Sequence, residues 1–133
     1  MFDWCNYWLN CTRGIRIRVG KNLQHVRKTG NPPLLCKDGY SVSIQGNSTA
    51  YCWPREDNCK KYEHVELGYP NQLDKLIMEY AEDTSIPTKT VYGYVPVTVV
   101  NKLIDKHGGF DKKKIFLDKL ANLLSITTYG YSS

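Results

Sequence analysis

Two segments alternate apolar and polar residues with the period of two that is typical of a half-buried β-strand. In residues 40–45, tyrosine, valine and isoleucine alternate with serine and glutamine. In residues 15–19, isoleucine and valine alternate with arginine. We therefore expect a strand in each segment, with one face buried and the other in solvent.

Further strands are predicted along the chain. Residues 50–53 follow a Gly-Asn-Ser turn, so we expect them to return as the hairpin partner of the strand at 40–45. Residues 62–69, which are followed by Pro70, and residues 89–95 have the composition of two more strands.

Two helices are predicted after the strands. Residues 97–107 place apolar side chains on one face, begin after Pro96 and end at a Gly-Gly pair. Residues 112–125 repeat apolar side chains at intervals of three to four. Strands followed by helices indicate an α+β fold, here a small antiparallel sheet of three to five strands with two C-terminal helices.

Residues 29–33, Thr-Gly-Asn-Pro-Pro, interrupt any regular element. We expect a basic N-terminal arm, residues 1–31, with a short helix and a strand, followed by a single α+β domain, residues 32–133.

The charged residues are also distributed unevenly between the arm and the rest of the chain. The 133-residue chain has a formal net charge of +5. Residues 1–37 carry seven basic side chains and one acidic one, whereas residues 38–133 carry 11 basic and 12 acidic ones. The basic character therefore belongs to the arm and says nothing about the partner of the main domain.

Two interpretations of the arm stay open. It could bind nucleic acid nonspecifically through phosphate contacts, or its charges could protect a solvated edge strand. The candidate nucleic-acid-binding residues are Arg13, Arg16, Arg18, Lys21, Arg27 and Lys28.

Composition and motifs exclude several classes. With 41% hydrophobic and 23% charged residues the chain is typical of a folded protein. Its apolar runs are shorter than a membrane span, and its N-terminus lacks the apolar centre of a signal peptide, so we expect an intracellular protein with no membrane partner. Walker A, GxGxxG, GxSxG and CxxC motifs are absent, so we expect no cofactor, no metal site and no catalytic residue. An alternative, a small enzyme that uses carboxylates or His64 and His107, has no supporting spacing.

The number of tyrosines and their position on predicted strands are the features of this sequence that stand out. Six of the ten tyrosines lie on or beside predicted strands, close to an arginine. Exposed aromatic rings on a sheet form a stacking surface for bases or other planar ligands. The alternative is that tyrosine simply favours strands, with its ring half-buried.

Residues 34–109 carry a pattern that resembles a group of small uncharacterised phage and prophage proteins. The matching positions are Cys36, Asp38, Gly39, Tyr40, Ser43 and Gln45; Tyr51, Pro54 and Arg55; Val65, Glu66, Gly68, Tyr69 and Pro70; Val91, Tyr92, Tyr94, Val95 and Pro96; and His107, Gly108 and Gly109. The group's usual Gln-Ala-Ser after the first strand is Gln-Gly-Asn here, so this turn differs.

The resemblance implies a viral accessory protein in the cytoplasm of a host bacterium. Such proteins often antagonise host defence without catalysis, as anti-CRISPR proteins do, by sequestering a nucleotide second messenger or by blocking a defence protein. A homodimer is expected as well, since a short sheet leaves an unpaired edge.

Polar and planar residues among the matching positions predict a ligand site on the sheet, in which arginine binds phosphate or carboxylate and tyrosines stack. The predicted ligand-binding residues are Gln45, Tyr51, Arg55, Glu66, Tyr69, Tyr92 and Tyr94. An ion pair between Arg55 and Glu66 that merely holds the hairpin is the structural alternative. Whether His107 and the two glycines after it only end a helix or belong to a site also stays open.

Overall fold

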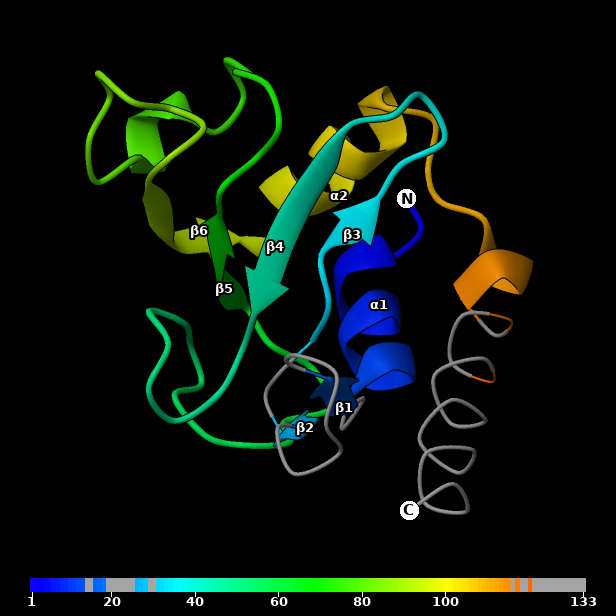
Figure 1. Cartoon of the computed structure of the whole chain (residues 1–133). Coiled ribbons are helices and arrows are strands. Elements are labelled where there is room, and N and C mark those ends of the chain that lie inside the picture. The colour runs from blue at the N-terminus through cyan, green and yellow to red at the C-terminus, as the bar shows by residue number, and fades with distance from the viewer. Residues whose placement is uncertain (14–15, 19–25, 29–30, 116, 118–119, 121–133) are drawn as a thin grey trace.

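The computed structural model describes residues 1–13, 16–18, 26–28, 31–115, 117 and 120 (Figure 1). Four antiparallel strands form the main sheet in the order β3-β4-β5-β6, and helices accompany it. This confirms the predicted small α+β fold.

The sheet is built from β3 (Leu34–Leu35), β4 (Ser41–Gln45), β5 (His64–Gly68) and β6 (Val91–Pro96). In β4, valine and isoleucine are buried while the two serines and the glutamine are partly exposed. The alternation predicted for residues 40–45 therefore sets which face of the sheet is in the core. Gln45 on β4 pairs in register with Glu66 on β5, so these two side chains share the outer face.

Helices α1 (Trp4–Thr12) and α2 (Val97–Lys106) contact each other and contribute to the core. Figure 1 shows α2 behind β4 and α1 beside β3. The buried face of the sheet and the apolar faces of both helices form one hydrophobic cluster. The helix predicted at 97–107 is confirmed, because α2 occupies almost the same residues.

Side chains attach α1 to the rest of the domain. Asn6 is buried and exchanges two hydrogen bonds with the backbone of Tyr62, at 2.8 and 3.1 Å. Asn101 on α2 accepts a hydrogen bond from the backbone N–H of Cys5 at 2.9 Å. The N-terminal helix of the predicted arm thus packs into the core of residues 32–133, while the division at residue 31 stays a prediction.

The hairpin predicted between 40–45 and 50–53 is wrong. Strand β4 pairs with β3 and β5, and in the segment 50–53 only Trp53 makes a single bridge, to His64. The reason is the loop that connects β4 to β5. It folds around Tyr62, whose buried ring brings its hydroxyl to the carbonyls of Gly46 and Glu56 at 2.9 and 2.7 Å.

The remaining elements are short. A two-stranded sheet joins β1 (Arg16–Arg18) to β2 (Val26–Lys28), and the 3-10 helix η2 (Met78–Tyr80) precedes β6. Residues 112–115 begin the last predicted helix, most of which lies outside the described residues. In the described part of the chain, no helix has the length and apolar character needed to cross a membrane.

Candidate functional site

A bulge in β6 turns Tyr94 out of the sheet. Val65 pairs with Val95 and Leu67 pairs with Tyr92, so Gly93 and Tyr94 together oppose the single residue Glu66. Tyr94 has a φ of +51°, which is rare for a bulky residue, and its side chain is 48% exposed. Such bulges re-aim side chains and are frequent beside functional sites.

Tyr51 is held against this bulge by hydrogen bonds on both sides of its backbone. Its carbonyl accepts from the backbone N–H of Tyr94 at 2.9 Å, and its N–H donates to the Glu66 carboxylate at 2.8 Å. The two tyrosine ring centroids lie 6.0 Å apart, with an angle of 45° between the ring planes. Gly93 lies directly against Tyr51, since a Cβ there would be in van der Waals contact with the Tyr51 Cβ, at 3.4 Å.

The two tyrosines border a depression with a volume of about 310 Å³. We call it the tyrosine surface; its lining residues are Tyr51, Tyr80, Glu82, Val91, Gly93 and Tyr94. The Arg55 guanidinium lies beside it, 6.0 Å from the Tyr51 ring centroid. It donates one long hydrogen bond, of 3.4 Å, to the Thr49 carbonyl, and among the described residues its other N–H donors have no hydrogen-bond acceptor.

The structure therefore brings together four of the seven predicted site residues: Tyr51, Arg55, Glu66 and Tyr94. No ion pair joins Arg55 to Glu66, so the structural alternative for this pair does not hold among the described residues.

The other three predicted residues lie elsewhere. The Gln45 amide accepts from and donates to the backbone of Asn31, at 3.3 and 2.8 Å, and so fixes the chain before β3. Tyr92 is fully buried, and its hydroxyl donates to the Pro87 carbonyl at 2.6 Å. Tyr69 is 62% exposed with a φ of +50°, but it does not line the tyrosine surface.

Arg13 is the one basic arm residue whose side chain the structure describes. Its guanidinium donates to the carbonyls of Asn58 and Cys59, at 3.4 and 2.6 Å. The side chains of Arg16, Arg18, Arg27 and Lys28 and the whole of Lys21 lie outside the described residues. Nucleic-acid binding by the arm therefore stays a prediction.

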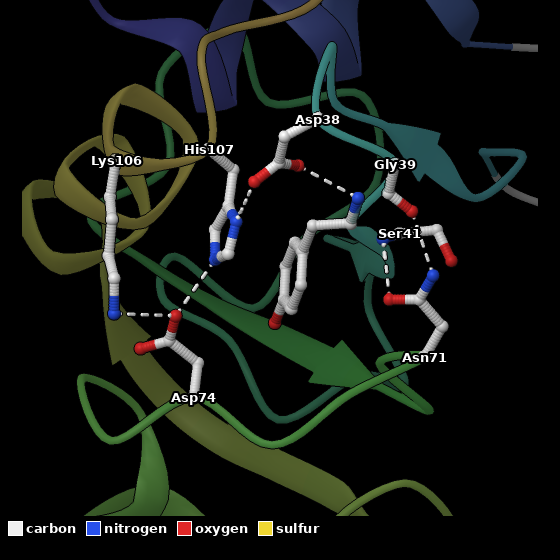
Figure 2. A network of polar contacts seen from close by, with 8 residues as sticks. Asp38, Gly39, Ser41, Asn71, Asp74, Lys106 and His107 are labelled. Carbon is white, nitrogen blue, oxygen red and sulfur yellow. Dashed lines mark hydrogen bonds and ion pairs between the residues drawn. The ribbon is translucent and has the colours of Figure 1, made fainter.

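Sequence reasoning missed a polar network around the buried side chain of His107 (Figure 2). The His107 Nδ1 lies 2.6 Å from a carboxylate oxygen of Asp38, and its Nε2 lies 2.8 Å from one of Asp74. The Lys106 ammonium donates to the same Asp74 oxygen at 3.0 Å. The ring of Tyr40 stacks on the imidazole, with centroids 4.0 Å apart.

Both carboxyl groups of this network favour their charged form. The hydrogen bonds from the Tyr40 backbone N–H and from His107 lower the pKa of Asp38. Burial alone would raise the pKa of Asp74, but the hydrogen bonds from the Leu76 backbone, Lys106 and His107 outweigh it and leave this pKa lowered. Each ring nitrogen of His107 lies within hydrogen-bond distance of a carboxylate oxygen, so the two aspartates hold the imidazole from both sides.

His107 also ends α2, and the two glycines after it adopt positive φ values of +89° and +72°. The Gly-Gly pair therefore terminates the helix as predicted, while the histidine side chain ties α2 to the segments of Asp38 and Asp74. The separation of these partners by 69 and 33 residues explains why spacing did not reveal them.

The described residues include no cluster of three or more histidine, cysteine or acidic side chains that could hold a metal ion. Comparison with known proteins finds no matching family model, no matching curated protein and no matching solved structure.

Proposed function

We propose that this chain is a phage-encoded, non-catalytic binding protein that antagonises bacterial defence by sequestering a nucleotide signal on the tyrosine surface. The observation that carries this proposal is the pair of exposed tyrosines, Tyr51 and Tyr94. Their backbones are hydrogen-bonded to each other beside a small depression and an arginine.

The depression supports a small ligand. Its volume of about 310 Å³ lies at the lower end of the range of ligand pockets, roughly 300–1,000 Å³. Stacking of a base on an aromatic side chain contributes about 1–3 kcal/mol per base. Because hydrogen bonds already fix the backbones of Tyr51 and Tyr94, binding has to order only their side chains.

The charged groups fit a nucleotide in two places. Arg55 has unused donors for a phosphate, which it can bind in a bidentate manner. Glu82, which lines the depression, offers carboxylate oxygens to the amino groups of a base or to ribose hydroxyls.

The same surroundings argue against catalysis. The depression is lined by tyrosines, small or apolar residues and one carboxylate, without a nucleophile next to a base. The carboxylate of Glu66 already accepts the Tyr51 N–H, and His107 is engaged at both nitrogens. Sequestration requires only affinity, which this set of residues supports.

A second candidate, blockage of a defence protein, is favoured by Trp53. This residue is 56% exposed and follows Tyr51 by two positions. Tyrosine, tryptophan and arginine are the residue types that dominate the binding energy of protein interfaces.

Isothermal titration calorimetry of the full chain against linear and cyclic mono- and dinucleotides tests the proposal. We expect heat of binding with at least one nucleotide, a stoichiometry near one per chain, and weaker binding of the matching nucleoside, which lacks phosphate. Traces without heat for every nucleotide would overturn the nucleotide version and leave the protein-blocking version.

A further inference from the structure

Three aromatic side chains beside the start of the last helix form a cage around an ammonium group. The Lys112 ammonium lies 4.2 Å from the ring centroid of Phe2. It lies 4.9 Å from that of Tyr7 and 5.7 Å from that of Trp4. All three distances fall within the roughly 6 Å over which an aromatic face attracts a cation. We call Phe2, Trp4 and Tyr7 the aromatic cage; none of them lines the tyrosine surface.

Contacts between rings support the cage. The Phe2 ring lies against those of Trp4 and Tyr7, with centroids 4.8 and 5.4 Å apart. The buried ring of Phe110 packs against the same two walls, with centroids 4.8 and 6.0 Å apart. The Trp4 backbone N–H donates to the Phe2 carbonyl at 3.0 Å, which fixes the segment that leads into α1. The three walls therefore hold one another in position around a single cation.

The cage is accessible from solvent. Phe2 is 43% exposed, and Trp4 and Tyr7 are partly exposed. Lys112 is exposed as well and lies in the first turn of the last helix. Exposed side chains change rotamer within nanoseconds, so Lys112 can leave the cage without any change in the sheet or in α1. Another cation can then take its place.

Lys112 is a poor match for the cage that it occupies. Within the described residues its ammonium forms no ion pair and no hydrogen bond. The neighbouring carboxylate of Asp111 accepts the backbone N–H groups of Lys113 and Lys114 instead, at 2.9 and 3.3 Å. A primary ammonium is strongly hydrated and has three N–H donors, which ring faces satisfy poorly. A trimethylammonium group has the same charge without N–H donors, and its methyl groups pack against aromatic rings.

We propose that the aromatic cage is a binding site for a small trimethylammonium compound, for which Lys112 holds the place in the free protein. The cation seated among the three rings identifies the charge that the cage accepts. Because the lysine competes with the ligand, the affinity of the intact chain depends on the difference between two cations in one cage. This site is independent of the tyrosine surface and of the function proposed for it.

Choline is the probe, and its methyl protons report binding by NMR, since aromatic rings shift the signal of protons above their faces upfield. We expect this shift to saturate with Lys112→Ala and to show about tenfold weaker binding to the wild-type chain, in which the lysine competes. Two matched compounds are ethanolamine, a primary ammonium, and dimethylbutanol, in which carbon replaces the choline nitrogen. Each should bind the Lys112→Ala chain about tenfold more weakly than choline.

Two further variants separate cage binding from other effects. Lys113→Ala removes the neighbouring lysine, which has no ring contact within the described residues, and should leave the wild-type affinity unchanged. Phe2→Leu, combined with Lys112→Ala, keeps an apolar side chain but removes one ring, and should weaken choline binding severalfold. All three replaced side chains are exposed, so we expect every variant to fold.

Four results would each overturn the proposal. The first is the absence of an upfield shift with Lys112→Ala at millimolar choline. The second is equal binding of choline and dimethylbutanol. The third is an equal effect of the Lys112 and Lys113 substitutions, and the fourth is unchanged choline affinity when Phe2→Leu is added to Lys112→Ala.

Discussion

Replacing Asp74 with asparagine is expected to lower the free energy of unfolding by about 3 kcal/mol, the cost of breaking a buried ion pair. One oxygen of Asp74 accepts from both His107 and Lys106, and the other accepts the Leu76 backbone N–H. The side chain is only 2% exposed. Asparagine keeps the shape but removes the charge and one acceptor, so it cannot satisfy all three donors. Urea unfolding followed by circular dichroism measures the loss.

Asp105→Asn is the matched control, because this exposed aspartate lies on α2 and its carboxylate forms no hydrogen bond or ion pair within the described residues. We expect it to change the free energy of unfolding by less than about 0.5 kcal/mol.

The effect of Asp74→Asn should also depend on pH. A lowered folded-state pKa means that Asp74 contributes stability above its ordinary pKa of 3.8 and loses it as the pH falls through the folded value. The difference between wild type and variant should therefore shrink below about pH 4, and a difference that grows there would contradict the ion-pair interpretation.

Replacing Gly109 with alanine is expected to cost a similar amount, about 3 kcal/mol, for steric reasons. Gly109 has a φ of +72°, which an L-residue adopts only with strain. A Cβ at this position would also lie 2.7 Å from the ring of Trp4, which packs edge to face against Phe110. Thermal or urea unfolding measures the change.

Gly108→Ala separates the two causes. Gly108 has a comparable φ of +89°, but a Cβ there would meet only the Lys37 Cβ, at an ordinary 3.5 Å. We expect a cost of about 1 kcal/mol from backbone strain alone. Equal losses for the two alanine variants would show that the contact with Trp4 is not what Gly109 protects.

Local patterns predicted most of the fold. The alternation in residues 40–45 identified β4 and its buried face, and Pro96 with the Gly-Gly pair marked both ends of α2. These signals succeed because each is read within a few residues of the feature that it specifies.

The features that the sequence did not predict depend on contacts between residues that are far apart along the chain. The segment 50–53 has the composition of a strand, but β4 pairs instead with β5, and Tyr51 is held by the Glu66 side chain and the bulge at Tyr94. A bulge leaves no pattern in a single sequence. The sequence therefore predicted that Tyr51, Tyr94 and Glu66 lie in one site, but not the bulge and hydrogen bonds that hold them there. For the same reason, the sequence does not reveal the hydrogen-bond partner of Gln45 or the burial of Tyr92.

The central claim, that the tyrosine surface binds a planar nucleotide, is tested most directly by comparing Tyr94→Ala with Tyr69→Ala. Both tyrosines are exposed and have nearly equal positive φ values, +51° and +50°, but only Tyr94 lines the depression. For the nucleotide that binds wild type best, calorimetry should show a loss of affinity of about tenfold or more for Tyr94→Ala. Tyr69→Ala should retain wild-type affinity. Equal affinities of the two variants, with both folded by circular dichroism, would contradict the account.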